Sequence, residues 1–309
     1  MKHEELAVFS LVLALMLTVE VTLRSVESHL SGDVLQIQGI ERVGTRLEAD
    51  TSDVKVLWLG NSMTADGIDL SVADSILGRS TSYGVSNYAV HPDGSGIPEW
   101  LYIATSDFFN RGAAPDLLVI PFAWNLLSDE TPVEVARIGR WYLHSASDWL
   151  EFFGRDARGF EPKVHAVLAN ASTAFGNRDR IRNKILGFLP GYQEMARELS
   201  RGGATAGNGG SSPGTGYSRL NRLLAAAEKT DTQVVLVAMP VRVPYSIDPN
   251  LQRLVDDAPG VRLIDLRETE GIGPASFRDG IHLLPDGARV VTASISERLT
   301  ETLAGGRAD

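Results

Sequence analysis

Short apolar runs alternate with segments of helical periodicity along most of the chain. Runs expected to be buried strands occupy residues 54–59, 83–90, 116–121, 233–239 and 261–266. Helical spacing is found at residues 70–77, 98–109, 217–229 and 284–303. Strands that alternate with helices favour a parallel sheet with helices on both faces and right-handed crossovers. The pattern therefore predicts an α/β fold.

The alternation is interrupted between residues 131 and 200, which we interpret as a helical insertion, either a lid or a membrane-facing surface. The pattern there predicts helices at residues 133–150, 162–174 and 178–186. The last of them carries a basic cluster, Arg178, Arg180, Arg182 and Lys184. Such a cluster is usually a solvated helix face, and binding of an anionic polymer or of lipid headgroups is the alternative.

The N-terminal segment is almost wholly apolar from residue 6 to residue 19, and the apolar run resumes after Glu20. Its length is just sufficient to span a bilayer, so a membrane anchor is the preferred interpretation. A signal peptide is one alternative, although Lys2 is offset by Glu4 and Glu5 and no small-x-small cleavage site follows. A soluble core helix is the other alternative.

These patterns divide the chain into segments. We expect a membrane anchor or signal segment over residues 1–24 and a stalk or short helix over residues 25–53. An α/β domain is expected over residues 54–303, interrupted by the insertion. Residues 201–216 are rich in Gly, Ser, Ala and Thr without periodicity, which is typical of a flexible loop.

Composition narrows the class of function. The net charge of −10 argues against a nucleic-acid partner, which requires a basic surface. The absence of Cys excludes disulfides, thiolate catalysis and Cys-ligated zinc. No P-loop, complete dinucleotide-binding Gly motif or His-x-x-x-His pair occurs, so we expect neither a cofactor nor a metal.

A serine follows the first predicted strand. The strand stops at Gly60, and Ser62 comes shortly after it, before the next predicted helix. A serine on a sharp turn at the carboxyl end of a strand exposes its hydroxyl where open α/β sheets bind ligands. Ser62 could instead simply cap the helix that follows.

A second motif lies near the C terminus, where Asp279 and His282 have an Asp-x-x-His spacing before the closing helix. In a turn, both side chains can lie on one side of the backbone. The carboxylate can then accept from one imidazole nitrogen and leave the other facing outward as a base. A lone His is more often structural, and Asp-Gly is a common turn pair, so this motif is weak by itself.

Taken together and in this order, the motifs resemble those of the SGNH/GDSL hydrolase superfamily. Gly-Asn-Ser at residues 60–62 resembles its first block, residues 85–90 and 121–126 its second and third, and Asp-Gly-Ile-His at residues 279–282 its last. The resemblance covers residues 54–303. It implies a three-layer α/β/α sandwich with a five-stranded parallel sheet of the flavodoxin-like order 2-1-3-4-5.

The resemblance also implies roles for site residues. Ser62 would be the nucleophile, His282 the base and Asp279 the residue that orients the imidazole. The oxyanion donors would be the Ser62 N–H, the Ala89 N–H and the Asn125 side chain. Asn125 follows the third strand, so it would share a sheet edge with Ser62, and its alternative role is to satisfy the loop backbone.

Three of the motif blocks depart from the family pattern. Asn61 stands where the family usually has Asp, Ala89 where its oxyanion Gly lies, and residues 123–126 read Ala-Trp-Asn-Leu rather than Gly-x-Asn-Asp. Losing the Gly changes the geometry of the Ala89 donor, although any residue but Pro retains the N–H.

The resemblance implies a serine esterase that removes O-acyl groups, in particular O-acetyl groups, from an acylated small molecule or an envelope glycan. Transfer of the acyl group to an extracellular polysaccharide is one alternative. A non-catalytic glycan-binding or scaffold protein of the same fold is the other. The expected location is the cell membrane, with one span and an extracytoplasmic catalytic domain, and secretion is the alternative. No particular protein partner is predicted.

Overall fold

The computed structural model describes residues 3–189, 191–192 and 216–305, so the predicted loop at residues 201–216 lies outside the described residues except for Gly216. The chain divides into two compact units. We call residues 1–37 and 134–208 the helical unit, and residues 38–133 and 209–309 the α/β unit. Each unit is treated separately below.

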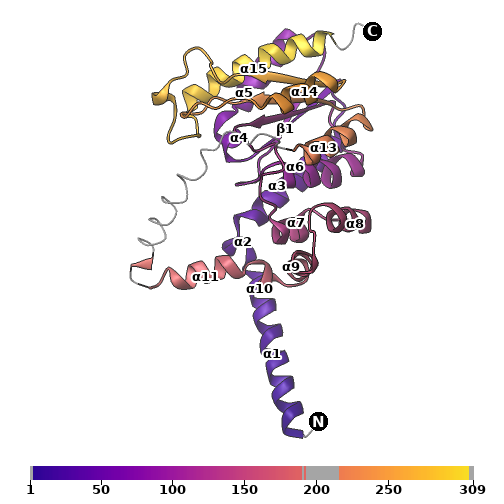
Figure 1. The fold of residues 1–309 in the computed structure, drawn as a ribbon, viewed down its shortest axis with the longest axis vertical. Coiled ribbons are helices and arrows are strands. Elements are labelled where there is room, and N and C mark those ends of the chain that lie inside the picture. The colour runs from indigo at the N-terminus through magenta and orange to yellow at the C-terminus, as the bar shows by residue number, and fades with distance from the viewer. Residues whose placement is uncertain (1–2, 190, 193–215, 306–309) are drawn as a thin grey trace. The chain divides into compact units, whose positions relative to one another are not determined.

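The α/β unit is built on a five-stranded sheet in the order β2-β1-β3-β4-β5 (Figure 1). The strands are β1 (Val54–Leu59), β2 (Val85–Val90), β3 (Leu117–Phe122), β4 (Gln233–Ala238) and β5 (Val261–Asp265). Every neighbouring pair is parallel. The predicted α/β class, the five parallel strands and the order 2-1-3-4-5 are therefore confirmed.

Burial explains why these runs form strands. All six residues of β3 are buried, and β1 and β4 have one partly buried residue each. A parallel strand covered by helices on both faces needs apolar side chains on both faces, so its sequence is continuously apolar. The edge strands β2 and β5 are less buried, and their sequences are correspondingly more polar.

Helices connect the strands of the α/β unit, and one more helix, α15, follows the last strand. They are α4 (Ser62–Gly67), α5 (Leu70–Ser80), α6 (Ile97–Tyr102), α13 (Ser218–Glu228), α14 (Pro249–Asp257) and α15 (Pro285–Gly305). Helices α5 and α15 pack together, and buried side chains of both join the core formed by β1, β3 and β4. The short helix α4, which Ser62 opens, was not predicted as a separate element.

Two predicted helices are interrupted. Residues 98–109 form α6, then a π-helical segment (Ile103–Phe108) and a 3₁₀ turn (Phe109–Arg111). Residues 133–150 form α7 (Val135–Trp141) and the start of α8 (Ala146–Arg155). Ser145 accepts from the Asp148 N–H, and Asp148 accepts from the Ser145 N–H. This capping box starts a new helix and prevents a continuous one.

The helical unit contains α1 (His3–Ser25), α2 (Glu27–Leu30) and the first residues of α3 (Gly32–Ala49). It also contains α7, α8, α9 (Phe160–Ala171), α10 (Thr173–Gly176) and α11 (Arg178–Leu186). Helices α7 and α9 pack closely at Gly139, where a Cβ atom would come within 2.7 Å of the Ala166 Cβ. A larger residue at this position would therefore separate the two helices.

The segment expected to be a stalk or short helix, residues 25–53, is mostly helical. The later part of α3 belongs to the α/β unit, and its Ile40 and Leu47 are buried there. Gly44 approaches the Asp107 carbonyl oxygen, since a Cβ atom would lie 3.4 Å from it. The end of this segment is therefore packed into the α/β unit and is not a free linker.

Candidate active site

The turn after β1 exposes Ser62 because of the two residues before it. Gly60 has no room for a side chain: a Cβ atom would overlap the Thr64 hydroxyl and lie 2.6 Å from the Thr64 Cβ. Asn61 is the N-cap of α4, and its side-chain oxygen accepts from the Met63 N–H at 3.0 Å. Since Asn61 caps the helix, the Ser62 hydroxyl is not needed for that role.

Asn61 has a second contact that an Asp could not make. Its side-chain nitrogen donates to the Ser95 carbonyl oxygen at 2.9 Å, and the residue is buried. The contact ties the turn after β1 to the loop after β2. A carboxylate at this position would face that carbonyl without a proton to donate. The Asn at this position therefore has a structural reason.

Ser62, His282 and Asp279 form one hydrogen-bonded series. The Ser62 Oγ lies 3.0 Å from the His282 Nε2. The His282 Nδ1 lies 2.7 Å from the Asp279 Oδ2. Ser62 follows β1 and His282 precedes α15, so residues 220 positions apart in the sequence meet at the carboxyl edge of the sheet.

Asp279 is fixed by its own loop. Its Oδ1 accepts from the Ile281 N–H and the His282 N–H, both at 2.9 Å. Burial alone would raise the pKa of the Asp279 carboxyl, but these donors and the His282 ring lower it to about 2. Because the ionised carboxylate can only accept, the His282 Nδ1 carries a proton. In the neutral imidazole the Nε2 is then left to accept from the Ser62 hydroxyl.

Contacts that the sequence did not suggest hold the histidine loop in place. Arg278 forms an ion pair with Asp66 on α4, with 2.7 Å between the Arg Nη2 and the Asp Oδ2. The Arg242 N–H donates to the Gly280 carbonyl at 2.9 Å. The first contact joins the Asp279–His282 loop to the helix that begins with Ser62. Neither Arg278 nor Asp66 belongs to a motif that could be recognised in the sequence.

The backbone N–H of Ala89 does not point toward β1, the strand that Ser62 follows. The Gly60 N–H donates to Val90 and the Val54 N–H donates to Gly84, which means that even-numbered residues of β2 bond to β1. In a parallel ladder alternate residues bond to opposite sides, so the Ala89 N–H faces the open edge of the sheet. This orientation does not favour Ala89 as an oxyanion donor.

Asn125 lies in the turn that follows β3, the strand next to β1. Its carbonyl oxygen accepts from the Ser128 and Thr131 hydroxyls, at 2.8 and 2.7 Å. These bonds order the turn and leave the side-chain amide without a protein partner among the described residues. The Ser62 N–H, the first amide of α4, likewise has no acceptor among the described residues. Both groups are available as donors.

The neighbouring residue Trp124 has a positive φ of 49°, which is uncommon for a bulky residue. Its ring lies 6.2 Å from that of Tyr245, and the Tyr245 hydroxyl donates to the Phe122 and Met239 carbonyls. The turn after β3 is thus held in an unusual conformation by packing from the loop after β4. Such strain is found preferentially at functional sites.

Within the described part of the chain, no group of three or more His, Asp or Glu side chains is placed to hold a metal ion. The fold and the site together define an α/β protein with a Ser–His–Asp series at the carboxyl edge of its sheet.

No family model and no curated protein matches the chain. Among solved structures, a candidate acylhydrolase from Bacteroides fragilis NCTC 9343 is 13% identical, with a TM-score of 0.41 over 82% of this chain and 90% of that one. An α/β hydrolase enzyme from the metagenome of Lake Arreo, Spain, is also 13% identical, with a TM-score of 0.40 over 83% of this chain and 99% of that one. Similarity at this level does not identify a function.

Proposed function

We propose that the α/β unit is a serine-dependent acyl ester hydrolase of the SGNH/GDSL type. The observation that carries the proposal is the 3.0 Å contact between the Ser62 Oγ and the His282 Nε2, with Asp279 at 2.7 Å behind the imidazole. Nucleophile, base and orienting acid are the minimum set for acyl transfer through serine. Their assembly from distant segments favours an enzyme over a scaffold that merely retains the fold.

The first half of the reaction makes an acyl-enzyme. The His282 Nε2 takes the Ser62 proton while the Ser62 Oγ bonds to the ester carbonyl carbon. The imidazolium then gives that proton to the alkoxide oxygen as the ester C–O bond breaks, and the alcohol leaves. Asp279 stabilises the imidazolium, which it can do because its low pKa keeps it charged.

The second half uses water. His282 takes a proton from a water molecule, whose oxygen bonds to the acyl carbon, and then returns the proton to Ser62 as the acyl–serine bond breaks. The carboxylic acid leaves. In both halves the carbonyl oxygen becomes negative, and the Ser62 N–H and the Asn125 side-chain amide are the donors we assign to it. Removing one such donor typically costs about 3 kcal/mol of transition-state stabilisation.

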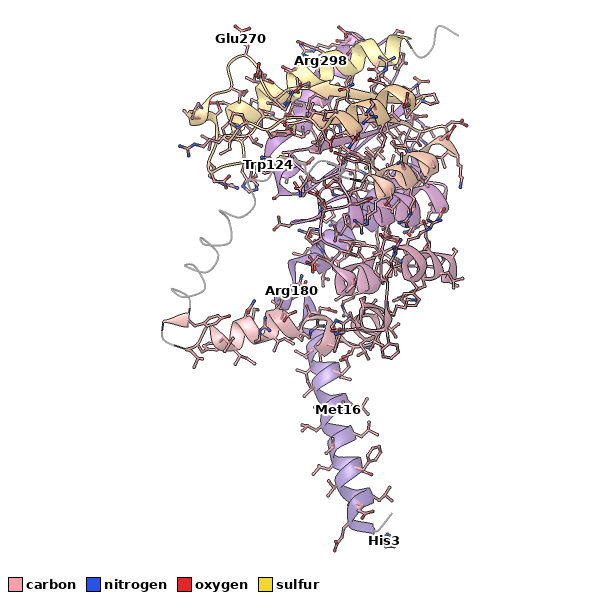
Figure 2. All side chains as sticks on the ribbon, viewed as in Figure 1. His3, Met16, Trp124, Arg180, Glu270 and Arg298 are labelled. Atoms are coloured by element: carbon pink, nitrogen blue, oxygen red, sulfur yellow. The ribbon has the colours of Figure 1, made fainter. Side chains whose placement is uncertain are left out.

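We further propose that α1 anchors the chain in a membrane and that the substrate is an O-acylated, in particular an O-acetylated, envelope glycan. Helix α1 is the one described helix that is long and apolar enough to cross a bilayer, with a mean hydropathy of 2.3 and no buried residue in that window. Its side chains, such as Met16, project from the helix (Figure 2). The glycan class and the extracytoplasmic placement rest on the family resemblance.

Labelling with a fluorophosphonate, combined with hydrolysis of a chromogenic acetyl ester, tests the proposal. We expect the full chain to be labelled, and Ser62→Ala and His282→Ala to lose turnover by a factor on the order of 10⁴ or more. Ser71→Ala, which alters an exposed serine of α5, is the matched control and should keep both signals. Wild-type turnover in Ser62→Ala would refute the mechanism. Adding a glycan acceptor would distinguish acyl transfer from hydrolysis.

A further inference from the structure

Outside α1, exposed apolar side chains of the helical unit recur at helical spacing on α9 and α11. On α9, Phe160, Val167 and Leu168 are exposed, with Phe160 85% exposed, and the half-buried Val164 lies on the same side at helical spacing. The opposite side of α9, with Ala166 and Ala169, is buried. An apolar side that faces outward on a folded helix marks a surface that another phase or molecule covers.

Helix α11 has a related pattern. Ile181, Ile185 and Phe188 follow the spacing i, i+4, i+7, the last of them in the turn that continues the helix, and Phe188 is 87% exposed. At 100° per residue, basic residues flank this apolar stripe on both sides: Arg178 and Arg182 on one, Arg180 and Lys184 on the other.

This arrangement is typical of helices that lie in a membrane interface, where apolar side chains enter the lipid and basic side chains meet headgroups. The polar side of α11, with Asp179 and Asn183, is opposite the stripe.

Hydrogen bonds tie the end of α9 and the start of α10, the short helix before α11, to the end of α1. The Glu20 carboxylate accepts from the Thr173 N–H at 2.7 Å and from the Ser172 hydroxyl at 2.9 Å. Arg24 donates to the carbonyl oxygen of Ala171, the last residue of α9, at 3.0 Å. Glu20 and Arg24 close the apolar run of α1, so they mark the level at which a spanning helix would leave the hydrocarbon. The end of α9 and the start of α10 are fixed at that level.

The direction of α11 is the one expected of a helix that lies where α1 would leave the hydrocarbon. Figure 1 shows α11 running crosswise to α1, near the end of α1 that meets α10. Arg180 forms an ion pair with the buried Asp33, and Lys184 donates to the His29 carbonyl, so this side of α11 is held by α2 and α3. In the stripe beside it, Ile185 and Phe188 remain exposed, while Ile181 is half-buried. A helix that crosses a membrane span at its end lies along the membrane surface.

We infer that the apolar stripes of α9 and α11 form a second membrane attachment, which lies on the surface of the same bilayer that α1 spans and prefers anionic lipid. We call this surface, made of Phe160, Val164, Val167, Leu168, Ile181, Ile185 and Phe188, the interfacial surface. The inference rests on the proposed anchor and adds a lipid-contacting role for residues that lie more than 100 positions after α1 in the sequence.

The chain contains no Cys, so a single introduced Cys can carry one fluorophore at a chosen place. We would label Val167→Cys and Phe188→Cys in the full chain, reconstituted in vesicles of phosphatidylcholine and phosphatidylglycerol with brominated acyl chains. Asn183→Cys, on the opposite side of α11, is the matched control, and Val12→Cys reports on α1 itself. Ester hydrolysis is measured on the same vesicles.

We expect blue-shifted, bromolipid-quenched emission at residues 12, 167 and 188, and emission typical of water at residue 183. Replacing both Arg178 and Arg182 with Gln should reduce quenching at residue 188 in the anionic vesicles. Quenching at residue 12 alone would overturn the interfacial surface and leave the anchor intact. Blue shifts at residues 167 and 188 without bromolipid quenching would mean that protein covers the surface, which also overturns the inference. Loss of quenching at residue 12 would refute the anchor and the inference together, while hydrolysis would still report on the active site.

Discussion

At the scale of single residues, the site depends on side chains that do two things at once. Asn61 accepts from the Met63 N–H and donates to the Ser95 carbonyl, while Asp279 accepts from two amides and from the imidazole. Each residue fixes its own backbone turn and also a second group. Removing either side chain therefore affects two contacts at once.

Asn61→Asp tests this double role, because it keeps the cap acceptor and removes the donor. We expect the free energy of unfolding to fall by about 1–2 kcal/mol, since the Ser95 carbonyl is left facing a carboxylate in a buried place. Denaturant unfolding of the purified chain measures the change. If Asn61→Asp were as stable as the wild type, the link between the two loops would be of no energetic importance.

Asn125→Ala tests the oxyanion assignment at the same scale. The change removes a side-chain amide that has no other partner in the described structure, so stability should hardly change. We expect kcat for ester hydrolysis to fall by about 10²–10³ with little change in KM. Ala89→Gly is the contrasting variant: because the Ala89 N–H faces the sheet edge, kcat should stay close to that of the wild type.

At the scale of elements, the nucleophile helix and the histidine loop are separate pieces held together by Arg278 and Asp66. Both side chains are substantially exposed, so the pair contributes little to global stability. Asp66→Asn and Arg278→Gln should each lower kcat by about 10-fold through misplacement of His282, with unfolding midpoints unchanged. The exchanged pair, Asp66→Arg with Arg278→Asp, should recover part of the loss. Equal kcat in all variants would exclude a positioning role.

The junction of α3 with β2 gives a pH prediction. Burial acts to raise the pKa of the Asp50 carboxyl, but the Ser52 N–H, the Ser52 hydroxyl and the Tyr88 hydroxyl lower it to about 2. Because this pKa lies below the ordinary 3.8, folding favours the ionised form, and its contribution is complete above about pH 4. The contribution is lost as the pH falls toward 2.

Asp50→Asn should therefore reduce the free energy of unfolding by about 1 kcal/mol at pH 7. The difference from the wild type should shrink between about pH 4 and pH 2, as judged from urea unfolding at a series of pH values. A difference independent of pH would show that the carboxylate charge is irrelevant at this junction.

At the scale of the whole molecule, the sheet was predictable because a strand that is buried on both faces has a continuously apolar sequence. The runs at 54–59, 233–239 and 261–266 differ from the observed strands by at most one residue. The break between α7 and α8 could have been found from Ser145 and Asp148, whose spacing is that of a capping box.

The residues of the site were predictable only where they belong to a sequence motif. The contact of Ser62 with His282 was expected from the order of the motifs along the sequence. The direction of the Ala89 N–H depends on which residues of β2 pair with β1, and one sequence alone does not specify that register. The contacts of Asn61 with Ser95 and of Asp66 with Arg278 join segments whose approach exists only in the folded chain.

The hydrogen bonds of Glu20 have a consequence for how the protein matures. A peptidase that removed the first helix as a leader would remove Glu20 with it. The Thr173 and Ala174 amides at the start of α10 would then lose their acceptor, and the Ser172 hydroxyl its partner. Glu20 caps a helix about 150 positions downstream, and the mature chain would lack this cap if α1 were cleaved off. We therefore expect the chain isolated from its cell to retain its original N-terminal segment.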